Sequence, residues 1–178
     1  MRMPARSVLR IRPVLWGALL LFAFPCHAQT EPDGSLLGRT ESELQANFPD
    51  LQRLHKPLPG PRGLRGLWVL PTRPVAGLPL ETTFYLKNGR VHRIEQRLTS
   101  TERQCSDPAS FAVLVSAMES RYGPGLVSSD TAERETKRNA AVWAAGAFDV
   151  AAHFARSPGQ CAITVVYHAH AEKDAAEL

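Results

Sequence analysis

Cysteine is scarce in this sequence, with three residues among 178. Cys26 lies close to the N-terminus, whereas Cys105 and Cys161 lie far apart in the remaining chain. This separation lacks the short ligand spacing of zinc sites, so it argues against a zinc-stabilised fold. Cys105 and Cys161 therefore form one disulfide or remain as two buried thiols.

Acidic residues are absent before Glu31. In this N-terminal segment, four arginines precede an apolar run over residues 14–24. The run is too short for a bilayer core, which needs about 20 residues. A proline follows the run, and small residues precede Gln29. This is the pattern of a secretory signal peptide over residues 1–28. We expect cleavage near Ala28–Gln29, a periplasmic or secreted product and no transmembrane segment in the mature chain; an uncleaved anchor is the alternative.

The net charge of +4 comes entirely from this N-terminal segment, because residues 29–178 hold 17 basic and 17 acidic residues. These charges are unevenly distributed. The net charge is −4 over residues 29–52, +7 over residues 53–103 and −3 over residues 104–178. We do not expect an exported protein of zero net charge to bind nucleic acid. The basic middle third instead predicts an anionic partner.

Catalytic motifs are also missing from the chain. It contains no nucleophile elbow, phosphate-binding loop, HExxH helix or zinc quartet. We therefore expect a protein that is not an enzyme and uses no cofactor. Since a catalytic site assembled from distant residues leaves no such motif, an unrecognised hydrolase stays as a third hypothesis.

Two helices are predicted from their N-terminal signals. Thr40 and Glu43 match a capping box, in which each side chain bonds the other residue's backbone amide. Asp107 as N-cap and Pro108 as first helical residue predict the second helix.

After each helix we expect a loop, a short strand around a buried tryptophan, and a hairpin. The loops are placed at residues 57–66 and 127–139. The Asn88-Gly89 pair is a strong signal for a tight hairpin turn. Val91 and Ile94 break the period of two, so a β-bulge at His92–Arg93 is needed to bury both.

These cycles predict an α+β fold of two αβββ repeats, over residues 40–100 and 106–168. The antiparallel sheet would carry two helices packed on one face. We expect one domain over residues 40–168, preceded by a flexible N-terminal arm (29–39) and followed by a polar tail (169–178).

Three short motifs support this layout. Residues 37–44 (LGRTESEL) are similar to a "G-x-T-x-x-E/Q-V" helix start, residues 121–124 (RYGP) to a "k-Y-G-x-P" helix end, and residues 84–94 (FYLKNGRVHRI) to an "f-x-f-x-n-G-x-V-x-x-i" hairpin. The layout resembles the tandem repeats of the beta-lactamase inhibitor proteins and of the small SmpA/OmlA-type envelope lipoproteins. The resemblance implies a protein that binds other proteins and is not an enzyme.

Arginines of the basic middle third are the candidate residues for binding an anionic partner. A guanidinium group suits planar, bidentate contact with a carboxylate or phosphate. A solvated sheet face, partly neutralised by acidic helices, is the alternative. The candidates are Arg62, Arg65, Arg90, Arg93 and Arg97.

Three histidines are candidates for a metal site. His168 and His170 are two residues apart on a predicted strand, so their side chains share a face. His153 lies on the preceding strand. Because two histidines without a third ligand rarely hold a metal, we expect exposed polar residues and no metal site.

The function we expect is an exported, non-enzymatic binding module that recognises another envelope protein or an anionic envelope component. The alternative is a periplasmic protein that binds a small ligand or a metal.

The first testable prediction concerns the two distant cysteines. A disulfide between Cys105 and Cys161 closes a loop of 57 residues, which in the chain-entropy model stabilises the fold by about 4 kcal/mol, less any strain. The double variant Cys105→Ser, Cys161→Ser should therefore unfold at a clearly lower urea concentration. Peptide mapping of the oxidised protein without reductant should recover the two cysteines in one linked fragment. Two thiols that both alkylate in the native protein would contradict the pairing.

Overall fold

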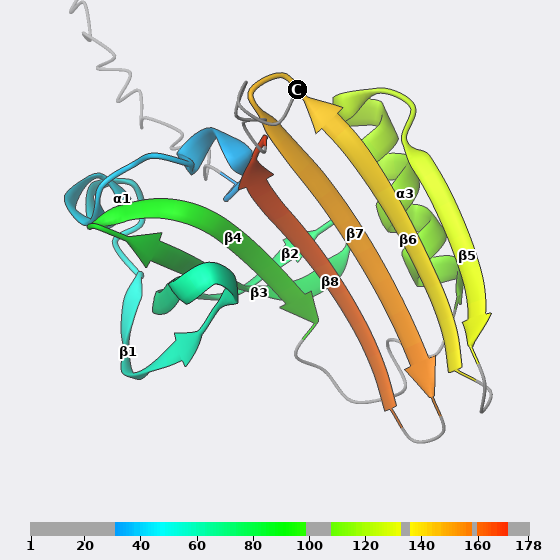
Figure 1. The fold of residues 1–178 in the computed structure, drawn as a ribbon, viewed down its shortest axis with the longest axis horizontal. Coiled ribbons are helices and arrows are strands. Elements are labelled where there is room, and N and C mark those ends of the chain that lie inside the picture. The colour runs from blue at the N-terminus through cyan, green and yellow to red at the C-terminus, as the bar shows by residue number, and fades with distance from the viewer. Residues whose placement is uncertain (1–30, 99–107, 133–135, 158–159, 171–178) are drawn as a thin grey trace, which may run out of the picture.

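A computed structural model describes residues 31–98, 108–132, 136–157 and 160–170 (Figure 1). The predicted signal peptide, Cys105, the predicted N-cap Asp107 and residues 171–178 of the tail lie outside these ranges. In the described part, no helix is long and apolar enough to cross a membrane.

The described residues form one antiparallel sheet of eight strands with two α-helices (Figure 1). The strands lie in the order β1-β2-β3-β4-β8-β7-β6-β5. The predicted α+β class with an antiparallel sheet is therefore confirmed. The elements are α1 (Glu41–Asn47), β1 (Gln52–Pro59), β2 (Arg65–Val75), β3 (Leu78–Lys87), β4 (Arg90–Leu98), α3 (Pro108–Tyr122), β5 (Leu126–Ala132), β6 (Thr136–Ala145), β7 (Phe148–Ser157) and β8 (Gln160–Ala169), with short 3-10 turns η1 (Gly34–Leu36) and η2 (Pro61–Gly63).

Four strands follow each helix, so the predicted αβββ order is wrong by one strand in each half. The segment 57–66, predicted as a loop, contains the end of β1, the turn η2 and the start of β2. The segment 127–139, also predicted as a loop, is mostly β5 and the start of β6. Both missed strands lie at the edges of the sheet. An edge strand tolerates proline and polar residues, because one side of its backbone needs no partner in the sheet.

The predicted hairpin and its bulge are confirmed. Asn88 and Gly89 form the turn between β3 and β4 with φ angles of 52° and 73°. Tyr85 pairs with Arg93 and Leu86 with Val91, which leaves His92 as the extra residue on β4. Val91 and the following Ile94 are both buried. The bulge therefore restores two apolar residues to the core.

The first predicted helix start is also confirmed. The Thr40 backbone amide donates to Glu43 Oε2 at 2.8 Å, and the Glu43 amide donates to Thr40 Oγ1 at 3.4 Å. Leu44 and Phe48 bury the apolar side of α1. Pro108 begins α3 as predicted.

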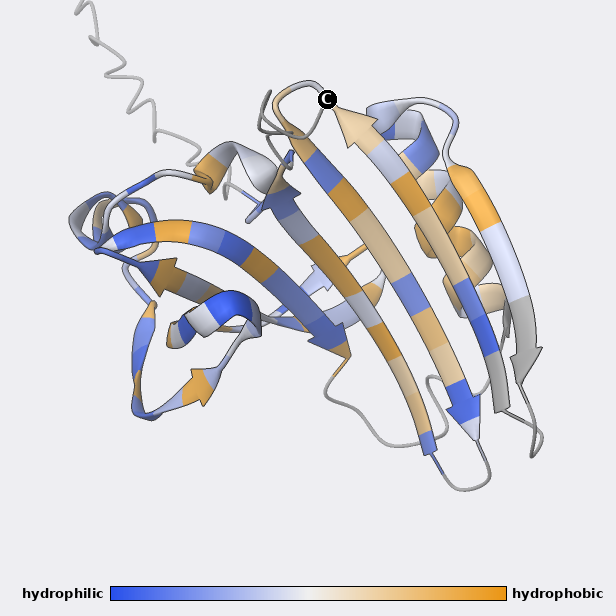
Figure 2. Cartoon of the chain, in the orientation of Figure 1, coloured by the Kyte–Doolittle hydropathy of each residue, from blue (hydrophilic) through white to orange (hydrophobic). Residues whose placement is uncertain are grey.

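Helices and sheet share a single apolar core, which includes Trp68 and Trp143, as predicted. Phe48 packs on Phe84 of β3, and Phe111 of α3 packs on Phe154 of β7, with ring centroids 6.0 and 5.8 Å apart. Apolar and polar residues alternate along the central strands (Figure 2). We call the side of the sheet that joins this core the core face and the opposite side the outer face.

Residues 31–39, predicted as a flexible arm, are tied to the sheet. Gln96 of β4 donates to the Pro32 carbonyl at 2.8 Å, and the amide of Gly38 donates to the Val91 carbonyl at 2.8 Å. A Cβ atom on Gly34 would lie 2.3 Å from the Phe148 ring, so this turn packs directly on β7. The segment closes one end of the core.

The hairpin of β1, η2 and β2 covers part of the outer face. Tyr85 points to that face, opposite to its core neighbour Phe84, and yet only 7% of it is exposed. The glycine backbone permits this cover, because a Cβ atom on Gly60 would lie 2.7 Å from the Tyr85 ring. The same hairpin carries η2 toward β4 and β8.

The capping box predicts a pH-dependent contribution of Glu43 to stability. Hydrogen bonds from the Thr40 backbone amide and from Arg39 lower the pKa of Glu43 from 4.5 to about 2. Since the pKa is lower in the folded state, this contribution is present above pH 4.5 and is lost as the pH falls toward 2. Glu43→Gln should therefore unfold at lower urea than the wild type at pH 7, and the difference should shrink below pH 4.5.

Urea unfolding at pH 7, 5 and 3 measures this difference. Glu119→Gln, on the exposed side of α3, is the control for removal of one negative charge from a helix. A gap between Glu43→Gln and the wild type that stays constant from pH 7 to pH 3 would be inconsistent with the capping role.

Candidate anion-binding pocket

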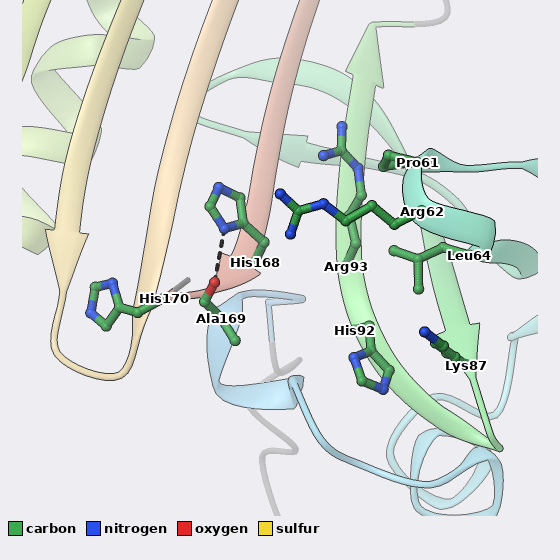
Figure 3. Close-up of a pocket in the computed structure, with 9 residues that line it drawn as sticks. All are labelled: Pro61, Arg62, Leu64, Lys87, His92, Arg93, His168, Ala169 and His170. Atoms are coloured by element: carbon green, nitrogen blue, oxygen red, sulfur yellow. Dashed lines mark hydrogen bonds between the residues drawn. The ribbon is translucent and has the colours of Figure 1, made fainter. Parts of the chain in front are cut away.

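A pocket of about 620 Å³ lies on the outer face, between η2 and the paired strands β4 and β8 (Figure 3). Its lining residues come from four parts of the chain that the fold brings together. They are Pro61, Arg62 and Leu64 around η2, Lys87 at the end of β3, His92 and Arg93 on β4, and His168, Ala169 and His170 at the end of β8. We call this the basic pocket.

The bulge on β4 explains why two consecutive basic residues face the pocket. In a regular strand, neighbouring side chains point to opposite faces. Because His92 is the extra residue, Val91 and Ile94 both turn to the core and His92 and Arg93 both turn away from it. The β-bulge that turns Val91 and Ile94 to the core thus also places His92 and Arg93 on the outer face.

The pairing of β4 with β8 supplies the second wall. Arg93 is paired with His168, and Ile94 with Tyr167. Tyr167 is buried in the core, so His168 next to it turns outward. Arg93 and His168, which are far apart in sequence, therefore share the outer face.

Arg62 reaches the pocket from the tip of the covering hairpin. It adopts a left-handed backbone conformation (φ 53°, ψ 34°), which is uncommon for a residue with a side chain. Figure 3 shows its side chain extending from η2 across the pocket toward His168. Figure 3 also shows the guanidinium groups of Arg62 and Arg93 on the same side of the pocket.

Among the residues that the structure describes, no acid lines the basic pocket. Arg93 Nη2 contacts Glu95 Oε2 at 3.1 Å, but the other oxygen of Glu95 pairs with Arg97 at 3.0 Å. One carboxylate is therefore shared by two guanidinium groups. Within the described ranges, neither Arg62 nor Lys87 has an ion-pair partner. Among the described residues, the acids near the pocket neutralise only part of its positive charge.

Arg93 also carries an unused donor. Its Nε atom is buried and has no hydrogen-bond partner among the described residues. A buried donor without a partner costs free energy.

Two histidines near this region have pKa values shifted in opposite directions. His170 bonds the Gly146 carbonyl at 2.5 Å and Asp149 at 2.9 Å, and these two contacts raise its pKa above 6.5. Partial desolvation on the sheet, followed by the charge of Arg93, lowers the pKa of His153. His170 is therefore the more readily protonated of the two.

The structure divides the arginines predicted to bind an anion. Arg62 and Arg93 line the pocket, whereas Arg65, Arg90 and Arg97 do not. Arg90 donates to the Gly38 carbonyl at 2.9 Å, and so helps to hold the N-terminal segment. Arg97 forms an ion pair with Glu95, and Arg65 is exposed at the start of β2.

The histidine candidates are divided in the same way. His168 and His170 line the pocket, but His153 lies on β7 opposite Thr164 and is not part of the lining. The described residues contain no group of three or more potential metal ligands.

Two of the basic lining residues, Lys87 and His92, were not among the sequence candidates. His92 is the bulge residue itself, so the predicted bulge carried the signal that its side chain leaves the core. Lys87 directly precedes the Asn88-Gly89 turn, a place where any polar residue is acceptable, and nothing in the sequence marks it.

Comparison of the chain with protein families, curated proteins and solved structures finds no match.

The histidine environments lead to a prediction for NMR titration. We expect the pKa of His170 to lie above 6.5 and that of His153 to lie below it. Asp149→Asn should lower the pKa of His170 part of the way, because the Gly146 carbonyl remains, and should leave His153 unchanged as an internal control. The result would be contradicted if His153 kept its proton to higher pH than His170.

Proposed function

We propose that this protein is an exported binding module without enzymatic activity, and that its basic pocket recognises an anionic component or partner of the cell envelope. The observation that carries the proposal is the presence of Arg62, Lys87 and Arg93 around one pocket that no acid of the described residues lines. Export rests on the signal-peptide pattern of residues 1–28.

Positive charge gathered in a concavity attracts anions more strongly than the same charge spread over a surface, because the field is concentrated there. The mature chain has zero net charge, so the attraction is local. The supporting side chains come from separate elements, and this favours a site that holds one ligand in a defined position.

The fold we propose behind this function consists of two units, each a helix followed by four strands. The strand order runs outward from β4 in one half and from β8 in the other, which is the arrangement expected of two like units joined by their last strands. Buried residues of α1 and α3 belong to the same core, in keeping with two helices on one face. The resemblance to the beta-lactamase inhibitor proteins and SmpA/OmlA-type lipoproteins, whose members bind other proteins, stays a prediction from the sequence motifs.

A small-ligand-binding protein is the second candidate. Pockets for small molecules measure about 300–1,000 Å³, and the basic pocket, at about 620 Å³, lies within that range. The two candidates share the same residues and differ only in the size of what is bound.

A charge-reversal experiment tests the pocket as the recognition surface. The triple variant Arg62→Glu, Lys87→Glu, Arg93→Glu should lose about tenfold or more of the material captured from envelope extract, because each change replaces attraction with repulsion. The matched control Lys56→Glu, Arg65→Glu, Arg138→Glu changes the net charge equally and alters only exposed residues outside the pocket. Capture is measured by quantitative mass spectrometry, and thermal unfolding verifies that both variants are folded.

Equal losses in the two triple variants would mean that overall charge governs capture. Undiminished capture by the pocket variant would remove the basic pocket from the proposed function.

A further inference from the structure

We propose that the basic pocket binds a phosphate monoester carried on a small organic body such as a sugar. This inference rests on the proposed function and adds the chemical class of the ligand.

The first argument is the amount of charge. Arg62, Lys87 and Arg93 bring three permanent positive charges to the pocket lining. The nearest partner of Arg93, Glu95, is divided between it and Arg97. A carboxylate supplies one negative charge, whereas a phosphate monoester carries about −1.5 to −2 near neutral pH. The surplus is matched better by the phosphate.

The second argument is the set of donors. Guanidinium groups bind phosphate oxygens through paired N–H bonds, and lysine adds a point charge. Arg93 uses Nη2 on Glu95, and 23% of its side chain remains exposed beside the pocket. This exposed part is what a phosphate oxygen can reach. A phosphate group has three terminal oxygens, so it can accept from Arg62 and Arg93, whose guanidinium groups lie on the same side of the pocket, while Lys87 across the pocket adds to the positive field (Figure 3).

The third argument is the size and the remaining lining. A volume of about 620 Å³ is far larger than a single phosphate group requires. Pro61, Leu64 and Ala169 offer apolar contact for an organic body. His92 and the Nε2 atom of His168 provide ring nitrogens that donate to or accept from hydroxyl groups. Both ring nitrogens of His170 are already bonded to Gly146 and Asp149. A hydroxylated ring bearing the phosphate uses all three kinds of lining.

Such a group has two sources in an envelope: a free sugar phosphate, or the phosphorylated sugar headgroup of a lipid. Titration calorimetry with glucose 1-phosphate, inorganic phosphate and glucuronate separates phosphate from carboxylate recognition on a comparable sugar. Flotation with phosphatidylcholine vesicles, with and without lipid A, separates the membrane-borne headgroup from the free sugar.

We expect glucose 1-phosphate to bind at least about tenfold more tightly than glucuronate, in line with the additional charge-assisted bonds. It should also bind more tightly than inorganic phosphate, because only the sugar reaches the apolar wall. Arg62→Gln and Arg93→Gln should each weaken binding about tenfold or more, and Arg62→Lys should restore part of the loss. Arg65→Gln, on the same hairpin and outside the pocket, should bind like the wild type. Arg62 lies exposed at a turn, so its variant tests the site even if Arg93→Gln unfolds.

Glucuronate bound as tightly as glucose 1-phosphate, or phosphate binding that survives Arg62→Gln and Arg93→Gln, would overturn this inference. The proposed function is judged separately by the capture experiment. Loss of capture in the pocket triple variant with no phosphate binding leaves the anionic partner in place and rejects the phosphate ester.

Discussion

The antiparallel pairing of β4 with β8 is the contact on which the rest of this structure depends. It is the ladder that joins the strands of residues 52–98 to those of residues 126–169. At its centre Ile94 is paired with Tyr167, and both are buried. Beside them Gln96 accepts a hydrogen bond from the Tyr167 hydroxyl at 3.3 Å and donates to the Pro32 carbonyl. A buried amide with partners on both its oxygen and its nitrogen fixes the junction more specifically than apolar contact alone.

The same register determines the outer face. With Ile94 and Tyr167 turned to the core, their neighbours Arg93 and His168 face the pocket together. A slip of one residue would exchange the faces of an entire strand. A slip of β4 would place Arg93 in the core, and a slip of β8 would place Tyr167 in solvent, each at a cost that no surface contact offsets. The free energy gained by burying the core residues fixes the strand register. The same register therefore fixes the positions of the pocket residues on the other side of the sheet.

Local sequence signals predicted the parts of the fold that depend on nearby residues. The capping box of Thr40 and Glu43, the Asn88-Gly89 turn and the bulge at His92 each involve a few consecutive positions, so their chemistry is visible in the sequence. The edge strands β1 and β5 were missed because β1 contains prolines and β5 is largely polar. An edge position removes the penalty for both, but only the assembled sheet shows which strands lie at its edges.

The sequence predicted that the pocket is basic, but it did not predict which basic residues line it. The surplus of arginine over residues 53–103 pointed to the right region, and Arg62 and Arg93 were among the candidates. What separates them from Arg65, Arg90 and Arg97 is the path of the covering hairpin and the junction with β8, both of which are long-range properties. Arg90 and Arg93 are close in sequence and were therefore predicted together. The bulge lies between them, and as a result Arg90 donates a hydrogen bond to the Gly38 carbonyl, whereas Arg93 lines the pocket.

The distribution of acids around the junction explains how the pocket keeps its charge. Glu95 lies one pleat from Arg93 on the same face, and a carboxylate there would neutralise a single arginine. Arg97 sits one pleat further and takes the second oxygen of Glu95. The three residues form a row along β4 in which two cations share one anion, so Arg93 is held in position without being fully compensated. Arg62 and Lys87 approach from turns on either side, where no described acid meets them. The ion pairs of Glu95 with Arg93 and Arg97 thus hold the Arg93 side chain in position, and Arg62 and Lys87 add positive charge. Recognition of an anion requires both.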